Sequence, residues 1–285
     1  MEESSVTIVG LPGSGKTTYL AALWAILKES PDKAVLRLRE LGSGDLKYLN
    51  EIAKTWRSAH EQKRTLQSVQ TVALHMIGPD EEAVSVTFPD PAGETFKRMW
   101  ADRSCSAAVF DQLVASGLMV FVHADKITYP NYIRDAANIA AQFGVPLQET
   151  EPAPWDVEKA PTQVQLVGLL DALRSPPFDD APRRVAVVIS AWDRAEGEGK
   201  SPERYLAERM PLLAQYIGQN LAGWEWRVYG VSAQGGEFDP DEDDRPLAPH
   251  ADRLRQLDTM AERIKMVGPE GQSNDLTEPL AWVLG

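Results

Sequence analysis

The stretch Ser-Val-Thr-Ile-Val-Gly-Leu-Pro-Gly-Ser-Gly-Lys-Thr-Thr, residues 5–18, predicts the organisation of the whole chain. Its first part, Val6 to Val9, is a β-branched run that favours a strand. A glycine-rich turn follows, and residues 19–27 then read as an apolar helix. A strand, a glycine-rich turn and a helix in this order are typical of a loop that binds phosphate groups.

The turn matches the pattern G-x-x-x-x-G-K-[ST] at every fixed position. Glycines let the backbone approach phosphates closely, and the amide groups at the start of the helix point toward the anion. We expect Lys16 to bridge the β- and γ-phosphates and the hydroxyl of Thr17 to ligate Mg²⁺. The nucleotide-binding residues predicted from this turn are Gly10, Gly13, Ser14, Gly15, Lys16, Thr17 and Thr18.

The composition excludes several classes of protein. The chain has 285 residues, of which 43% are hydrophobic, enough for a globular core. A net charge of −13, from 29 basic and 42 acidic side chains, argues against general binding to nucleic acid or to an anionic membrane. Cys105 is the single cysteine, which excludes an internal disulfide and favours a reducing compartment. With no long apolar run and an acidic N-terminus, we expect a cytoplasmic protein without a membrane span or signal peptide.

Strand-like runs alternate with helical runs along the chain. We expect strands at residues 6–9, 69–77, 83–88, 117–123, 184–190 and 224–231. We expect helices at residues 19–27, 45–62, 96–116, 132–143, 162–173, 202–221, 253–267 and 276–284. This alternation predicts an α/β fold, with a doubly wound and mostly parallel sheet that carries helices on both faces. The turn at residues 78–82 predicts one antiparallel hairpin strand in that sheet.

We interpret residues 1–285 as a single P-loop domain with enlarged regions. Insertions are expected near residues 31–64 and 127–182, and a helical segment is expected at residues 250–285. The helix predicted at residues 45–62, with Asp45 as its N-cap, is either a docking element for a partner or a packed insertion.

Polar residues follow several of the predicted strands, at the ends where ligands bind in open α/β sheets. Asp90, Asp125, Asp193 and Ser232 stand at such positions. Asp90-Pro-Ala-Gly93 matches D-x-x-G, in which the aspartate holds Mg²⁺ through a water molecule and complements the loop threonine. The amide of Gly93 would then sense a γ-phosphate, which makes this segment a candidate order–disorder switch.

The order of these motifs resembles that of the P-loop GTPases of the Ras-like, translation-factor-related class. In that family the fourth motif is Asn-Lys-x-Asp, and Ser190-Ala-Trp-Asp193 stands in its place. The fifth motif is Ser-Ala-Lys, and Ser232-Ala-Gln234 matches its first two positions. The resemblance covers most of residues 5–236.

The resemblance implies a guanine site. In the family the aspartate of the fourth motif pairs with N1 and N2 of guanine, which assigns this role to Asp193. The backbone of the fifth motif meets guanine O6, which assigns this role to Ser232 and Ala233. The family lysine whose stem covers the base is absent, and we expect Trp192 to offer an aromatic face in its place. The expected ligands are therefore GTP and GDP, with Mg²⁺ as cofactor.

The residue after the D-x-x-G glycine bears on hydrolysis. Many of these GTPases carry glutamine there to orient the attacking water, whereas this chain has Glu94. A carboxylate accepts a hydrogen bond from water but adds negative charge beside the γ-phosphate, so we expect slow hydrolysis. The catalytic residues predicted from the motifs are Lys16, Gly93 and Glu94.

The family also uses a threonine in the loop before the second strand as a metal ligand. We favour Thr65 for this role, with Ser68 and Thr71 as alternatives, and Thr17 and Asp90 complete the predicted metal ligands. Candidate arginine fingers acting in cis are Arg57, Arg64, Arg98 and Arg103, each of which also fits a plain surface position.

Residues 10–24 are similar to the start of bacterial GTPase-like proteins of the double-GTPase type. Such proteins are associated with conflict or anti-phage gene clusters. The resemblance implies a role in antiviral defence and protein partners that bind through the switch regions.

The leading hypothesis is a Mg²⁺-dependent GTP-binding switch that hydrolyses its nucleotide slowly. A P-loop ATPase or small-molecule kinase is an alternative, because the fourth motif is weak and Gly-x-Pro-Gly-Ser-Gly-Lys is common in phosphate-loop kinases. A non-hydrolysing, nucleotide-dependent scaffold in a larger assembly is a second alternative, which Glu94 allows.

Overall fold

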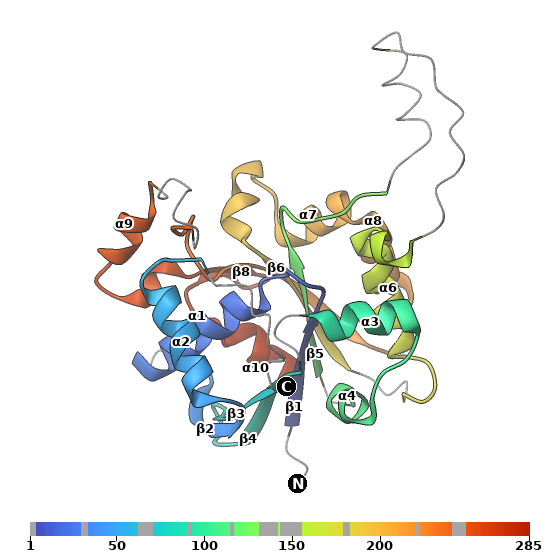
Figure 1. Cartoon of the computed structure of the whole chain (residues 1–285), viewed down its shortest axis with the longest axis horizontal. Helices are drawn as coiled ribbons and strands as arrows, with labels where there is room; N and C mark the ends of the chain where they lie inside the picture. Colours follow the sequence, from blue (N-terminus) through green and yellow to red (C-terminus); the bar gives the residue numbers. More distant parts are fainter. Residues whose placement is uncertain are drawn as a thin grey trace.

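A computed structural model shows how the elements assemble (Figure 1). It describes residues 4–29, 34–61, 71–89, 93–114, 117–130, 142, 156–178, 183–220, 223–240 and 249–285. The described strands form one nine-stranded sheet in the order β2-β3-β4-β1-β5-β6-β7-β8-β9. Their bounds are Ser4–Gly10 (β1), Arg37–Ser43 (β2), Val72–Ile77 (β3), Ala83–Phe88 (β4), Gly117–His123 (β5), Arg184–Ser190 (β6), Glu225–Ser232 (β7), Lys265–Gly268 (β8) and Gly271–Ser273 (β9).

The centre of the sheet is parallel. β1 lies between β4 and β5, with Val6 opposite Val86 on one side and Gly117 on the other. β5, β6 and β7 continue the parallel arrangement. β1, β5 and β6 are buried almost throughout, which explains their continuous apolar sequences, because helices cover both faces of the sheet. The predicted α/β, doubly wound and mostly parallel fold is confirmed.

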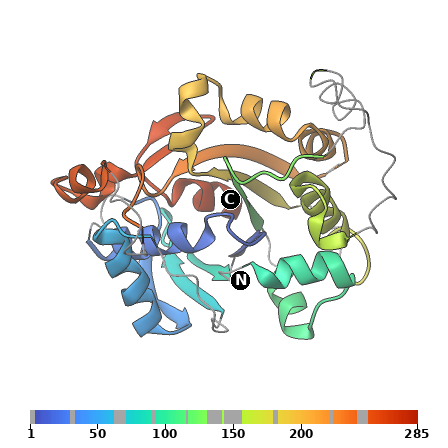
Figure 2. The ribbon, with the colours of Figure 1, turned by 45° about the horizontal axis from the view of Figure 1, so that its top comes forward.

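Helices cover the two faces in separate groups. The longer described helices are α1 (Lys16–Glu29), α2 (Leu46–Arg57), α3 (Glu94–Asp102), α4 (Ala107–Leu113), α6 (Thr162–Ala172), α7 (Pro202–Arg209), α8 (Pro211–Asn220), α9 (Ala251–Arg255) and α10 (Glu278–Leu284). One hydrophobic cluster joins the sheet to α1, α2 and α10, and a second joins it to α3, α4, α6, α7 and α8. In Figure 1, α1 and α2 accordingly lie on one side of β1 and α3 and α6 on the other, and Figure 2 shows the same separation from a second direction.

The antiparallel part of the sheet is larger than predicted. The hairpin of β3 and β4 is confirmed, with Val72 opposite Phe88. β2 adds a further antiparallel strand at that edge. At the other edge β8 and β9 are also antiparallel, whereas the sequence pattern predicts a helix at residues 253–267. The predicted helical segment at residues 250–285 is therefore wrong in its middle, because Lys265–Gly268 pairs with β7 and extends the sheet.

Two predicted helices are each two helices in the structure. The helix expected at residues 96–116 is interrupted at Arg103, which adopts a left-handed conformation, and α4 restarts after Ser106 as N-cap. The helix expected at residues 202–221 is interrupted at Met210, because proline at position 211 disfavours helical angles for the residue before it. The helix predicted at residues 132–143 lies outside the described residues, apart from residue 142.

The insertion predicted near residues 31–64 forms a packed part of the core where it is described. β2 and α2 arise from this stretch, and Asp45 caps α2 by accepting a hydrogen bond from the amide of Lys47, as predicted. Leu49, Ile52 and Trp56 on one face of α2 are buried in the cluster that contains α1. α2 is therefore a packed insertion on its inner face.

Candidate nucleotide site

The predicted phosphate loop lies between β1 and α1, at the carboxyl end of the central strand. β1 is buried from Val6 to Gly10, and α1 is buried from Tyr19 to Leu27. The loop is thus fixed at both ends by core elements. Of the loop and first-turn residues, Gly10, Ser14 and Lys16 are buried, Gly15, Thr17 and Thr18 are half-buried, and Gly13 is exposed.

Lys16 folds back into the loop that carries it. Its Nζ donates to the carbonyl oxygen of Gly10 at 2.7 Å and to that of Leu11 at 3.2 Å. It also lies 3.3 Å from the hydroxyl oxygen of Ser14. The side chain is only 2% exposed, so its ammonium group is buried at the centre of the loop, against these oxygen atoms. An ammonium group in this position suits the terminal phosphates of a nucleotide.

Ser190 ties the phosphate loop to the end of β6. Its hydroxyl donates to the carbonyl oxygen of Ser14 at 2.8 Å. The two groups are packed so closely that a Cβ atom on Gly15 would lie 2.5 Å from the Ser190 hydroxyl oxygen. Gly15 also has φ +92°, a conformation that other residues rarely adopt. Ser190 thus braces the loop from the strand that precedes the predicted base motif.

Gly93 contacts the same loop from the opposite direction. It caps α3 with φ +83°, and a Cβ atom there would lie 2.6 Å from Lys16 Nζ and 2.7 Å from the carbonyl oxygen of Gly10. Glu94 follows as the first residue of α3 and is exposed. The structure therefore brings Gly93 to Lys16 and leaves the Glu94 side chain exposed at the start of α3.

The residues predicted to bind the guanine base lie together at the ends of β6 and β7. The hydroxyl of Ser232 donates to Asp193 Oδ1 at 2.6 Å and accepts from the amide of Gly235 at 3.0 Å. Asp193 is half-buried in the short turn η3 (Trp192–Arg194). Ser232 thus fixes one carboxylate oxygen of Asp193 and leaves the second without a hydrogen bond in the described part of the chain.

The expectation that Trp192 covers a base is wrong for this structure. Trp192 is 1% exposed and packs edge-on against Tyr205, with ring centroids 5.5 Å apart. Its ring also lies under Gly230, where a Cβ atom would collide with the indole at 2.3 Å. The indole is part of the hydrophobic cluster on that face of the sheet, so it has no free face to offer a ligand.

The predicted metal ligands are only partly described. Thr17 is half-buried in the first turn of α1, whereas Asp90 and Thr65 lie outside the described residues, as does the alternative Ser68. The hydroxyl of Thr71 donates to the carbonyl oxygen of Pro89 at 3.1 Å and accepts from Gln112 at 3.0 Å. Because both functions of this hydroxyl are used inside the fold, Thr71 is the weakest of the three candidates for the switch threonine.

The candidate arginine fingers have other roles where they are described. Arg57 pairs with Glu29 at 2.5 Å, and the guanidinium of Arg103 stacks on Trp100 at 4.1 Å from the ring centroid. Arg98 is exposed on α3, and position 64 lies outside the described residues. None of these three arginines has a hydrogen bond or ion pair with the described residues of the phosphate loop.

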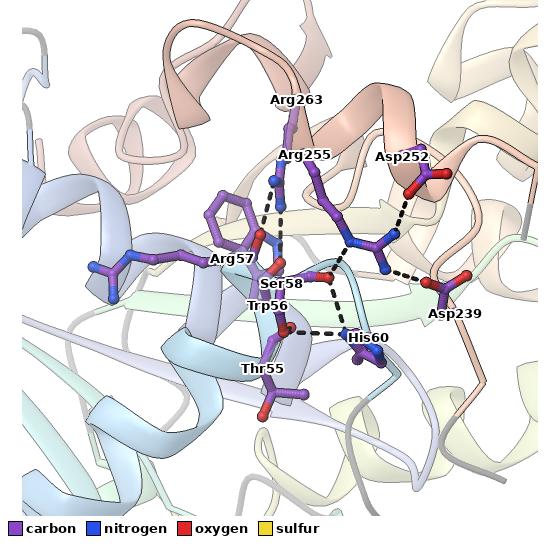
Figure 3. Close-up of polar contacts among 9 residues, drawn as sticks. All are labelled: Thr55, Trp56, Arg57, Ser58, His60, Asp239, Asp252, Arg255 and Arg263. Atoms are coloured by element: carbon purple, nitrogen blue, oxygen red, sulfur yellow. Dashed lines mark hydrogen bonds and ion pairs between the residues drawn. The ribbon is translucent and has the colours of Figure 1, made fainter. Parts of the chain in front are cut away.

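A polar cluster that no sequence motif indicates joins the end of α2 to the segment after β7 (Figure 3). The buried guanidinium of Arg263 donates to the carbonyl oxygens of Trp56 and Arg57, each at 2.8 Å, and of Leu254 at 2.9 Å. Arg255 donates to the carbonyl oxygen of Ser58 at 2.8 Å and pairs with Asp239 and Asp252. Three carbonyl groups at the C-terminus of α2, those of Trp56, Arg57 and Ser58, are thereby satisfied by arginine donors.

Trp56 extends this cluster to the predicted base motif. Its indole Nε1 donates to the carbonyl oxygen of Ala233 at 2.9 Å, and the side chain is fully buried. The backbone next to it pairs with the same segment, since the amide of Asp239 donates to Ala59 and that of Glu61 donates to Asp239. The described chain that leads toward residues 62–70 is therefore fixed to the loop that holds Ala233. No local sequence pattern predicts this contact, because its partners are 177 residues apart.

A family model described as Double-GTPase 1 matches residues 7–283. The chain belongs to the Double-GTPase 1 family. This confirms the resemblance to double-GTPase proteins that the motifs predict. No curated protein matches the sequence.

Solved structures resemble this member of the Double-GTPase 1 family only distantly. They include bacterial selenocysteine-specific elongation factor EF-Sec, at 14% identity over 82% of this chain with a TM-score of 0.40. The GTP-bound GTPase-like domain of S. cerevisiae Ski7 has 11% identity over 91% of this chain and a TM-score of 0.40. The signal recognition particle receptor SRb-GTP/SRX complex of Chaetomium thermophilum has 13% identity over 90% and a TM-score of 0.40. This chain spans 27% of the EF-Sec chain, 52% of the Ski7 chain and 97% of the third chain.

The described part of the Double-GTPase 1 chain contains no helix that is both long and apolar enough to cross a membrane. Its candidate nucleotide site draws on five places in the fold: the phosphate loop, the start of α3, the end of β6, the turn η3 and the end of β7. Four of these follow the carboxyl ends of parallel strands, where ligands bind in doubly wound sheets: the phosphate loop, the end of β6, the turn η3 and the end of β7.

Proposed function

We propose that the protein is a Mg²⁺-dependent guanine-nucleotide switch that hydrolyses GTP slowly. The observation that carries this proposal is the pair formed by Asp193 and Ser232 at the end of the sheet that also holds the phosphate loop. Ser190 connects the two parts, because it lies three residues before Asp193 and bonds to the loop at Ser14. The same hydrogen-bonded part of the fold would thus hold both the phosphates and the base.

The carboxylate of Asp193 fits guanine better than adenine. Guanine presents two neighbouring donors, the N1 and N2 hydrogens, to an acceptor, whereas adenine presents an unprotonated N1 at that edge. With Oδ1 held by Ser232, the second oxygen has no hydrogen bond in the described part of the chain and would accept from such donors. A site that is built to pair polar groups rejects a ligand that leaves them unpaired. This favours a GTPase over the ATPase and kinase alternatives.

The residues assigned to the metal fit Mg²⁺. Thr17, Asp90 and Thr65 would supply hydroxyl and carboxylate oxygens, the hard ligands that Mg²⁺ prefers together with water and phosphate. When bound, Mg²⁺ would neutralise part of the charge on the phosphates. Lys16 would hold the terminal phosphates from inside the loop, where its ammonium group already lies against backbone oxygens.

Gly93 would couple a bound γ-phosphate to the position of α3, and Glu94 would affect the rate of GTP hydrolysis. Gly93 lies against Lys16, so a γ-phosphate bound there would contact the start of α3. Glu94, exposed on the first turn of that helix, would accept a hydrogen bond from the attacking water and repel the phosphate. The expected result is slow intrinsic turnover, with protein partners that respond to the position of α3. The single cysteine favours the cytoplasm, and the family resemblance favours a setting in bacterial antiviral defence.

Phosphate release tests this proposal. The purified protein is given GTP or ATP, with Mg²⁺ or with EDTA, beside the variant Lys16→Ala. We expect slow phosphate release from GTP only, dependent on Mg²⁺ and abolished by Lys16→Ala, with an unchanged circular dichroism spectrum. Equal release from ATP, or from the Lys16→Ala variant, would contradict the proposal.

A further inference from the structure

A pocket of about 210 Å³ lies beside the phosphate loop, on the face of the sheet that carries α3 and α6. Residues 11–14 of the loop form one wall, and residues 121–123 at the end of β5 form another. Two lysines from different elements also line it, Lys97 from α3 and Lys126 from the segment after β5. The pocket therefore brings two cationic side chains close to a loop that binds an anion.

Lys126 runs alongside the exposed turn of that loop. A Cβ atom on Gly13 would lie 3.9 Å from Lys126 Cδ, which is ordinary van der Waals contact. Both residues are exposed, and the lysine side chain is long enough to extend along the loop. The amide groups of this turn point toward phosphate oxygens in a phosphate-binding loop. Lys126 thus stands where a bound triphosphate would leave its outer oxygens open to solvent.

The charged side chains near Lys126 are paired with other groups, so Lys126 remains available to bind a phosphate oxygen. The carboxylate of Asp125 is engaged by Arg194 of η3 and by His123, whose Nδ1 lies 2.6 Å from it. Lys97 is paired with Glu158 at 2.8 Å, and this hydrogen bond raises the pKa of Lys97. Burial lowers the pKa of His123, so the imidazole is neutral near pH 7. No carboxylate in the described part of the chain pairs with Lys126.

We propose that Lys126 is a catalytic residue that binds the outer oxygens of the β- and γ-phosphates in cis. In hydrolysis the oxygen of water bonds to the γ-phosphorus, and the bond from that atom to the bridging oxygen breaks. The electron pair stays on the GDP leaving group, and the proton of the water passes to the released phosphate. A cation beside the bridging and terminal oxygens stabilises the charge that develops there. This inference rests on the proposed function.

The experiment compares variants within the same pocket. Lys126→Gln removes the charge and keeps the length of the chain, whereas Lys126→Arg keeps the charge. Lys97→Gln is the matched control, because its ammonium group is already held by Glu158. We expect single-turnover GTP hydrolysis by Lys126→Gln to fall roughly 10- to 100-fold, the scale for one electrostatic donor, with little change in GDP affinity. Lys126→Arg and Lys97→Gln should stay close to the wild-type rate.

A second measurement does not depend on turnover. Aluminium fluoride with GDP mimics the transferred phosphoryl group, and a cation in cis should let the wild-type protein bind it without a partner. Binding that is lost in Lys126→Gln and kept in Lys97→Gln supports the proposal. Wild-type rates and binding in Lys126→Gln, or equal losses in both variants, would overturn it. Failure of the wild-type protein to bind GTP or GDP would instead contradict the proposed function itself.

Discussion

The indole of Trp56 and the carbonyl oxygen of Ala233 are joined by a buried hydrogen bond of 2.9 Å. Trp56 belongs to the last turn of α2, and Ala233 is the residue after β7 whose backbone we assign to guanine O6. The contact gives the inserted helix a direct structural link to the base side of the site. A change at either end is therefore expected to reach the other.

Trp56→Phe tests this link. The substitution removes the indole donor and leaves a buried carbonyl oxygen unpaired, at a cost of about 1–3 kcal/mol in the free energy of unfolding. Because that oxygen belongs to Ala233, we also expect weaker GDP binding, measured by titration of a fluorescent analogue. Trp24→Phe is the matched control, since its indole donates at 3.1 Å to Asn50 of α2 and makes no hydrogen bond with Ala233. It should destabilise without changing GDP affinity, and an equal loss of affinity in both variants would contradict the link.

Arg263→Met tests the arginine that caps α2. Three backbone carbonyl groups lose their donor, and a buried cation is replaced by an apolar chain of similar length. We expect the free energy of unfolding to fall by about 2–3 kcal/mol in urea titrations, because the carbonyl groups stay buried. Arg253→Met, at an exposed position on α9, should change it by less than about 0.5 kcal/mol. Similar midpoints for the two variants would show that the cap contributes nothing.

The parts that were predictable from sequence are those with local chemistry. Gly10 to Thr17 specify a loop through glycine positions and a lysine, and the alternation of residues 72–88 around a turn specifies a hairpin. The motif pattern also identifies Asp193 and Ser232 as strand-end residues. Such patterns predict the chemical type and the rough place of each group, which is enough to define a candidate site.

The remaining parts depend on tertiary contacts. Ser190 does not match the asparagine of the fourth motif. Its hydrogen bond to Ser14 depends on β6 lying beside the phosphate loop, which is a tertiary contact. Trp192 reads as an exposed aromatic, but Gly230 on the neighbouring strand opens a space that buries it. The strands at residues 265–273 are too short to show a period, although Gly268-Pro-Glu-Gly271 between them is a turn signal that favours a hairpin.

Glu94→Gln tests the origin of slow turnover. The variant keeps the shape of the side chain, removes its charge beside the γ-phosphate and adds a donor. We expect GTP hydrolysis at least as fast as that of the wild-type protein, with equal or tighter GTP binding, in a phosphate-release assay. Glu94→Ala should be slower than Glu94→Gln, because it positions no water. Loss of turnover in Glu94→Gln would identify Glu94 as a general base and replace the slow switch by a self-sufficient hydrolase.

We propose that Asp193 recognises guanine next to the phosphate loop, which Ser190 at the end of β6 holds by a hydrogen bond. Titration calorimetry with GTP, ATP and xanthosine triphosphate, on the wild-type protein and on Asp193→Asn, tests it most directly. Asp125→Asn is the control, because that carboxylate is held by Arg194 and His123. We predict that the wild-type protein prefers GTP to ATP by at least roughly 100-fold, that Asp193→Asn shifts the preference to xanthosine triphosphate, and that Asp125→Asn keeps it. ATP bound as tightly as GTP by the wild-type protein, or a preference unchanged in Asp193→Asn, would contradict the account.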